Sequence, residues 1–187
     1  MTKSKNLLKL LAIISIVLVS VCALTGCGKK NKDNNSDEKA YLEPLKNYFD
    51  GIKEKDLNKV LSAFPDFMDM SSNITMTEID ELYNYYEGQY GKNVKINYEF
   101  GDAVALGEDE LSELEDEIKS AYTDVEGVND IDLTAGYTVT IKVTISGDGV
   151  EQAQDQSQEN SEEQKTASDT VENEMYVIQY NGHWYAL

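Results

Sequence analysis

Apolar and polar positions divide the chain into parts with different periodicities. An apolar run without charges spans residues 10–24, a polar stretch follows at 28–39, and amphipathic sequence fills most of 40–187. Apolar residues at helical spacing predict helices, whereas strict alternation with polar residues predicts strands. The pattern therefore predicts one folded domain, residues 40–187, behind an apolar leader and a polar connector.

The folded part begins with a predicted helical hairpin. Its first helix begins close to Tyr41 and stops near Lys55, with Pro44 in the first turn, where no backbone donor is needed. Asp56 is expected to cap a second helix, which Pro65 closes. Two short amphipathic helices joined by a tight turn must bury their apolar sides against a further layer.

Two more helices are predicted downstream. After an irregular segment at 66–76, Thr77 and Asp80 resemble a capping box that opens a third helix, which Gly91 ends. Residues 108–122 form the fourth, with acidic residues in its first turn, where the helix dipole favours them.

Strands are predicted at 94–100, 137–145 and 171–180, and at the C-terminus. Asn181-Gly182 separates two apolar runs and predicts a type I′ hairpin that pairs Tyr180 with His183. Both faces of this hairpin carry apolar groups, so we expect the sheet to be covered on one side and partly on the other. Helices first and an antiparallel meander last predict an α+β fold.

Residues 148–170 interrupt the pattern. They carry seven acidic residues against the single Lys165, and contain no aromatic residue. Such a segment cannot bury enough apolar surface to order itself, so we expect a disordered acidic insertion at the tip of a hairpin.

The end of the apolar run resembles the lipobox of bacterial lipoproteins, with Leu24, Thr25 and Gly26 leading into Cys27. The resemblance implies that residues 1–26 are a signal peptide, and that Cys27 receives a diacylglycerol and often an N-acyl chain such as palmitate. Two chains anchor a protein stably where one does not. The alternative is an uncleaved signal anchor in which Cys27 is an ordinary thiol.

The net charge indicates which kinds of partner the surface favours. From Cys27 onward, 13 lysines face 35 acidic residues, a formal charge of −22, and the chain has no arginine. This surface repels nucleic acid and favours cations and basic partners. Residues 27–39 are expected to be a disordered tether of about 20 Å root-mean-square span, with Lys29, Lys30 and Lys32 next to an anionic membrane.

The domain is similar to the nuclear-transport-factor-2-like, or cystatin-like cone, superfamily, and above all to small lipoprotein domains of Gram-positive bacteria. The residues that carry this resemblance are Tyr48, Phe49, Ile52, Leu57, Val60 and Leu61 around the Lys55-Asp56 turn, and the closing stretch 180–185. The resemblance implies helices packed on a curved antiparallel sheet. Some members use the cone cavity as an active site, ketosteroid isomerase among them, and many only bind. The chain departs from the pattern at Lys55, where Gly is usual, and in its acidic insertion.

The candidate site residues are few. His183 is the only histidine, so no zinc site or catalytic triad can be assembled around it. Tyr83, Tyr86 and Tyr90 lie on the apolar stripe of the third helix, which leaves Tyr85 pointing elsewhere. We therefore expect no catalytic residue and no metal site, and take Tyr85, Trp184 and His183 as the candidate surface for a ligand or partner.

Acidic residues offer two further alternatives. Glu99 and Asp102, beside Tyr98, are the only nearby carboxylates for isomerase-like chemistry, but both fall on the outward phase of the strand. The acidic run at 108–117 lacks the loop that a calcium site needs, so a solvated helix face is expected.

The sequence therefore predicts a lipid-anchored, non-enzymatic binding module on the extracytoplasmic face of the cell membrane. Its partner is an envelope protein or a small ligand, and no cofactor is expected besides the covalent lipid. An enzyme that uses a carboxylate and a tyrosine in the cone cavity is the alternative. A transporter's solute receptor is a third possibility, although two lobes seldom fit in about 150 residues.

Overall fold

A computed structural model describes residues 40–149 and 167–187 of the chain. The lipobox, the tether and most of the acidic insertion lie outside the described residues. The helices are α2 Glu43–Glu54, α3 Leu57–Leu61, α4 Met76–Tyr90 and α5 Glu108–Ala121, and the strands are β1 Lys95–Ala105, β2 Leu133–Gly147, β3 Ala167–Tyr180 and β4 His183–Ala186. Four 3-10 helices accompany them, η2 Ala40–Leu42, η3 Asp66–Met68, η4 Met70–Ser72 and η5 Val128–Asp130.

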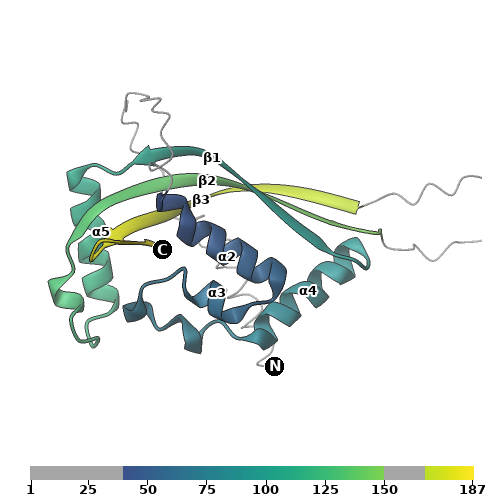
Figure 1. Ribbon diagram of the computed structural model, residues 1–187, viewed down its shortest axis with the longest axis horizontal. Helices are drawn as coiled ribbons and strands as arrows, with labels where there is room; N and C mark the ends of the chain where they lie inside the picture. The colour runs from purple at the N-terminus through teal and green to yellow at the C-terminus, as the bar shows by residue number, and fades with distance from the viewer. Residues whose placement is uncertain (1–39, 150–166) are drawn as a thin grey trace, which may run out of the picture.

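The four strands form one antiparallel sheet in the order β1-β2-β3-β4. Figure 1 shows this sheet arching over α2, α3 and α4, which lie on its concave side, while α5 lies at one end. The α+β prediction, with N-terminal helices packed on a curved antiparallel sheet, is confirmed. None of the described helices is long and apolar enough to cross a membrane.

Both faces of the sheet are covered at the hairpin end, as the apolar groups on both faces of the final hairpin predicted. Val177 and Ile178 are neighbours in β3 and therefore point to opposite faces, yet both are fully buried. Val177 belongs to the large core under α2 and α4, and Ile178 to a smaller core with Ile118 of α5 and Leu133 of β2.

The helical hairpin forms as predicted at its turn. The Asp56 side chain caps α3 by accepting a hydrogen bond from the backbone N–H of Lys59, 3.2 Å away. Lys55 adopts the left-handed conformation, with φ at 54°, that Gly takes more readily. Gly51 allows the two helices to approach closely, because a Cβ there would lie 2.7 Å from Val60.

Several predicted boundaries are wrong. The first two strands are longer than predicted, because β1 continues to Ala105 and β2 begins at Leu133. The second helix ends at Leu61 instead of reaching the residue before Pro65. The capping box of α4 consists of Thr75 and Glu78, with the Glu78 carboxylate 2.8 Å from the backbone nitrogen of Thr75. The residue pair Thr77 and Asp80 lies inside the helix, which begins two residues after Ile74. Glu carries one more methylene than Asp and reaches back to the N-cap, and Ile74 is 2% exposed and fixes the entry of the chain.

A further wrong boundary is at the acidic insertion. Residues 167–170 were expected within the disordered segment, but they form the first residues of β3 and pair with β2. Residues 150–166 lie outside the described part. At the other end of β3, Asn181 and Gly182 both have positive φ, 51° and 75°, and Tyr180 pairs with His183, so the predicted type I′ turn is confirmed.

Candidate functional site

The structure places the predicted surface residues on two elements, Tyr85 on α4 and the neighbours His183 and Trp184 on β4. Tyr85 lies on α4 with 37% of its surface exposed, and its ring meets the buried Tyr86 edge to face at 5.5 Å. His183 is exposed at the first position of β4. Trp184, the next residue of the strand, is half-buried and points to the concave face, opposite to His183. The three residues therefore do not form one continuous site.

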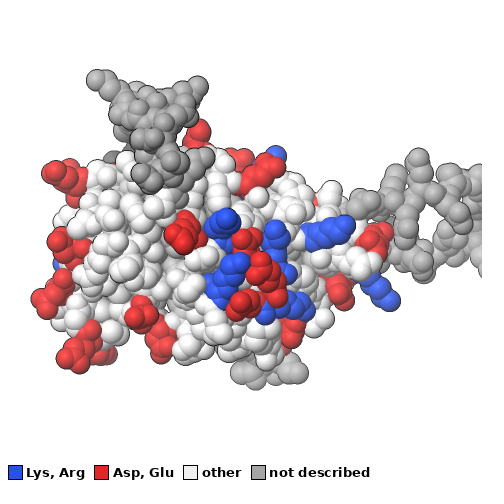
Figure 2. All heavy atoms as spheres, viewed as in Figure 1, with Lys and Arg blue, Asp and Glu red and all other residues white. Residues whose placement is uncertain are grey.

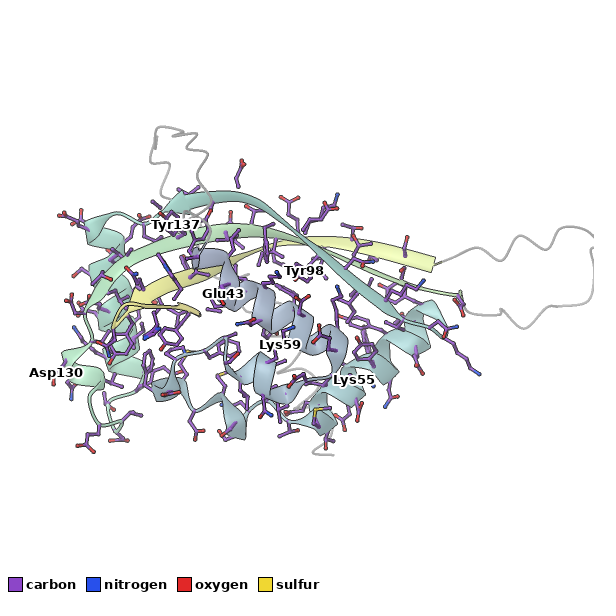
Figure 3. The ribbon with its side chains drawn as sticks, in the orientation of Figure 1. Glu43, Lys55, Lys59, Tyr98, Asp130 and Tyr137 are labelled. Carbon is purple, nitrogen blue, oxygen red and sulfur yellow. The ribbon has the colours of Figure 1, made fainter. Side chains whose placement is uncertain are left out.

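Trp184 belongs to an aromatic cluster that sequence reasoning missed. The rings of Tyr41 and Tyr137 stack with centroids 4.3 Å apart, and Trp184 lies 6.1 Å from Tyr41 and 5.7 Å from Tyr137. Figure 3 shows Tyr137 reaching from β2 toward the N-terminal end of α2. The cluster fastens the first residues of the domain to the sheet, close to where the predicted tether would join.

The interior under the arch is filled with apolar side chains. On α2, Leu45, Tyr48 and Phe49 are 0, 2 and 5% exposed, and they belong to the same core as the fully buried Val139 and Ile141 of β2. From α4, a second set completes the filling: Ile79, Leu82 and Tyr86. Burial raises the pKa of Tyr86 to about 12, with smaller contributions from neighbouring tyrosines, so its hydroxyl stays protonated even above pH 10.

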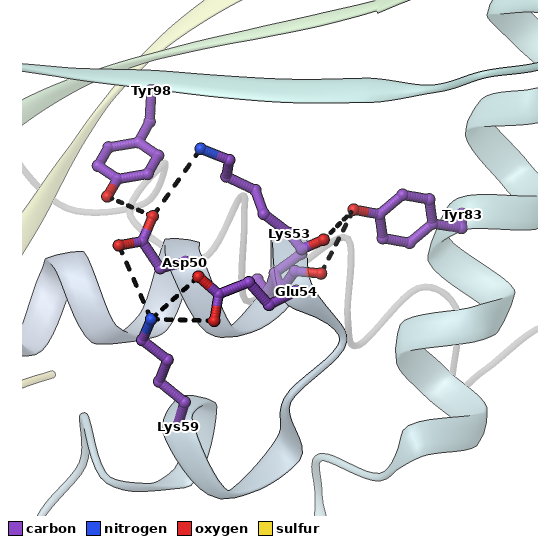
Figure 4. Close-up of polar contacts among 7 residues, drawn as sticks. Asp50, Lys53, Glu54, Lys59, Tyr83 and Tyr98 are labelled. Carbon is purple, nitrogen blue, oxygen red and sulfur yellow. Dashed lines mark hydrogen bonds and ion pairs between the residues drawn. The ribbon is translucent and has the colours of Figure 1, made fainter.

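A network of polar side chains lies where α2 meets β1. We call it the α2 polar cluster and define it as Asp50, Lys53, Glu54, Lys59 and Tyr98 (Figure 4). The Tyr98 hydroxyl donates to Asp50 Oδ1 at 2.8 Å. Lys53 and Lys59 each hold their ammonium 3.9 Å from the Asp50 carboxylate, and Lys59 also contacts Glu54 at 3.1 Å.

The electrostatics of this cluster keep Tyr98 a hydrogen-bond donor. Burial raises the pKa of Tyr98 most, and the hydrogen bond to Asp50 and the negative charge of that carboxylate raise it further. Lys53 lies over the Tyr98 ring, 5.3 Å from its centroid. The Asp50 side chain is 20% exposed, so it sits at the border between the core and the solvent.

The structure corrects the predicted partner of Tyr98. Glu99 is exposed, as its outward phase predicted, and Asp102 is exposed at the register shift between Phe100 and Ala103. The carboxylate beside the Tyr98 hydroxyl comes from α2 instead. The helical pattern marks Asp50 as the polar neighbour of Phe49, but no local signal links it to a strand 48 residues later. The pair was therefore invisible to periodicity.

The acidic helix α5 is only partly a solvated face. Glu115 is 19% exposed and accepts a hydrogen bond from the backbone N–H of Leu133 at 2.7 Å and another from Lys119 at 3.1 Å. The Leu133 bond, partly offset by burial, holds the pKa of Glu115 below its usual value. Glu115 thus fixes α5 to β2. Within residues 40–149 and 167–187, no group of three or more metal-ligating side chains is placed to hold an ion.

Acidic residues are concentrated around α5. Residues 108–132 contain eleven acidic residues against the single Lys119, whereas residues 43–61 carry four lysines and four acidic residues: Lys46, Lys53, Lys55, Lys59, Glu43, Asp50, Glu54 and Asp56. Figure 2 shows lysines interspersed with acidic side chains near the middle of this face, and acidic side chains without lysines beside them at the α5 end. Basic ligands would therefore be drawn more strongly toward α5 than toward α2 and α3.

A scan against protein-family models found no family that matches the chain, and searches of curated proteins and of solved structures found no significant similarity either.

Proposed function

We propose that this protein is a lipid-anchored module on the extracytoplasmic face of a bacterial membrane that binds an envelope protein or a small ligand without catalysing a reaction. The lipobox pattern at 24–27 supports the anchor. The polar connector at 28–39 supports a domain held clear of the lipid headgroups. Resemblance to cone-shaped lipoprotein domains supports the same role.

The observation that carries the binding role is the filled interior of the arch. In an isomerase-like cone, a carboxylate and a tyrosine face each other across a cavity that admits substrate. Here Leu45, Tyr48 and Phe49 occupy the space between α2 and the sheet and are nearly inaccessible. The groups that could contact another molecule are therefore on the outer surfaces of the domain.

The anchor is tested by substituting each of the two cysteines in cells fed a radiolabelled fatty acid. We expect Cys27→Ala to abolish label incorporation and signal cleavage, and to change the membrane retention of the protein. The matched control is Cys22→Ala, which lies within the apolar run and should be labelled and processed like the parent. Labelling of Cys27→Ala at the parental level would refute the anchor.

The binding role is tested by crosslinking in intact cells. A photoreactive amino acid replaces Tyr85 or His183, both of which are exposed. We expect at least one position to yield a discrete crosslinked species, while the same substitution at the buried Leu45 yields none. Equal, diffuse crosslinking from every exposed position would contradict a specific binding surface.

The Asp50–Tyr98 pair favours a second candidate, an enzyme that uses the carboxylate as a base and the hydroxyl as a donor. The two lysines beside Asp50 argue for a structural role, because they hold the carboxylate in an ion-pair network. Removal of a catalytic group commonly leaves a protein as stable or more stable, whereas removal of a structural pair destabilises it. The stability of Tyr98→Phe, developed below, separates the two candidates.

A further inference from the structure

Most of β3 has a neighbouring strand on one side only. It pairs with β2 along its whole length, but with β4 only from Val177 to Tyr180. Within the part of the chain that the structure describes, no strand lies against the other side of residues 167–175. Figure 1 shows the C-terminal strand beside only the last part of β3. An open edge of this length can accept an additional strand.

The hydrogen-bonding phase of this edge follows from its junction with the C-terminus. The carbonyl of Tyr176 accepts a hydrogen bond from the Leu187 N–H at 3.0 Å, so the backbone groups of Tyr176 point away from β2. Outward and inward groups alternate along an antiparallel strand. The backbone groups of Thr170, Glu172 and Glu174 therefore point outward as well.

The backbone N–H of Thr170 also has no partner on a neighbouring strand. Its backbone N–H donates to the carboxylate of the adjacent Asp169 at 2.7 Å, instead of to a strand. The corresponding N–H groups of Glu172 and Glu174 have no strand partner among residues 40–149 and 167–187. These two N–H groups and the carbonyls of the same residues are the donors and acceptors with which an added strand could pair.

Three devices that often block edge pairing, proline, lysine and a β-bulge, are lacking in this stretch, whose acidic side chains instead restrict which strand can pair with it. The opposite edge of the sheet, β1, is interrupted by a register shift between Phe100 and Ala103. Residues 167–176 contain no proline and no lysine, and the only irregularity in the β2–β3 pairing lies at the far end, near Leu133. Val171 is 45% exposed on the concave face, next to the buried Val143 of β2. It offers an apolar contact to an added strand.

Charge selects the occupant. Glu172 and Glu174 project from the convex face of the edge. Burial is the main cause that raises the pKa of the adjacent Tyr176, and the carboxylates of Glu174, and of Glu110 and Glu117 on α5, raise it further, so α5 adds negative charge close to this edge. Lys142 of β2 lies in register with Glu172. A second copy of this edge would place acids opposite acids, which destabilises strand pairing. Basic side chains would meet complementary charge.

We propose that the free edge of β3 at residues 168–174 binds an extended segment of a basic protein as an added strand, with lysine or arginine on the convex face and small apolar side chains on the concave face. This rests on the proposed binding role and names its partner class. Backbone bonds to Glu172 and Glu174 supply the register, and their carboxylates select basic sequences.

The test measures fluorescence anisotropy of a labelled heptapeptide of alternating Lys and Val with the full-length protein purified in detergent. Glu174→Pro removes one outward N–H at an edge, where proline is tolerated, and should weaken binding about tenfold. The pair Glu172→Gln and Glu174→Gln keeps the backbone and should weaken binding about threefold at physiological salt. Its matched control, Asp124→Asn with Glu126→Gln, removes the same charge elsewhere and should bind like the parent.

Two further probes separate the alternatives. The same peptide with N-methyl groups on alternate amides keeps its charge but cannot form the ladder, so it should not bind. Equal binding of the methylated peptide, equal binding to Glu174→Pro, or no binding of the parent peptide would overturn the proposal. Sedimentation that finds a dimer which Glu174→Pro dissociates would assign the edge to a second copy and overturn it too. None of these results bears on the lipid at Cys27, so the anchor stands or fails separately.

Discussion

Replacing Tyr98 by Phe tests whether the α2 polar cluster stabilises the fold. The substitution keeps the ring, which stacks on Phe49 with centroids 5.0 Å apart, and removes only the hydroxyl that donates to Asp50 at 2.8 Å. Asp50 would keep Lys53 and Lys59 at 3.9 Å. The variant therefore loses one hydrogen bond without leaving a buried charge unpaired.

The expected loss follows from this geometry. Hydrogen bonds to charged groups contribute about 1.5–3 kcal/mol when well shielded. Because Asp50 is 20% exposed and keeps its lysines, we expect the free energy of unfolding to fall by about 1 to 1.5 kcal/mol. The melting temperature of a chain of this size should fall by about 2–6 °C.

Urea unfolding of residues 27–187, followed by circular dichroism, measures the loss. A double-mutant cycle with Asp50→Asn should give a coupling energy of about 1 kcal/mol. The matched control is Tyr85→Phe, an exposed tyrosine, which should change stability by less than about 0.5 kcal/mol. If Tyr98→Phe is as stable as the parent, or the coupling is zero, the cluster is not structural and the enzymatic alternative gains support.

Further predictions concern the core and the ionisable groups. Leu45→Ala should lower the free energy of unfolding by about 3 kcal/mol in the same urea assay, because Leu45 is fully buried. Gly51→Ala should cost about 1–3 kcal/mol, because its Cβ would collide with α3; a neutral result would show that the helices can separate. Because folding lowers the pKa of Glu115, this carboxylate stabilises the fold above pH 4.5, the pKa of the unfolded chain, and the stabilisation is lost as the pH falls through the folded pKa. Glu115→Gln should therefore reduce the difference in the free energy of unfolding between pH 7 and pH 3. Because folding raises the pKa of Tyr86 to about 12, the stabilisation by its neutral hydroxyl is present below pH 10 and is lost as the pH rises toward 12. Absorbance at alkaline pH should show Tyr86 ionising late, and titration near pH 10 in the folded protein would contradict its burial.

Local signals in the sequence were sufficient for most elements. The Asp56 cap and the Asn181-Gly182 turn depend on residues a few positions apart, and the structure confirms both. Capping of α4 was misplaced by two residues, because both Thr75 and Thr77 are followed three positions later by an acid and only the longer Glu78 reaches back. Burial of Ile74 decided between them, and burial depends on tertiary packing.

Contacts between distant segments could not be predicted. The Asp50–Tyr98 pair joins α2 to β1, and the Glu115 hydrogen bond to Leu133 joins α5 to β2. Neither acid differs from its solvated neighbours in the sequence. The open edge of β3 was also hidden, because composition assigned residues 167–170 to the acidic insertion, whereas pairing with β2 extends the strand through them. Strand pairing with a neighbour overrides composition where the partner strand is long and strongly β-forming.

Mass spectrometry of the protein purified from membranes and cleaved after lysine tests the central claim most directly. The account predicts that the first peptide is Cys27-Gly28-Lys29, with a diacylglyceryl group in thioether linkage on Cys27 and, in many hosts, an additional acyl chain on its amino group. A peptide that continues upstream through Gly26, or one with an unmodified thiol at Cys27, would contradict the account.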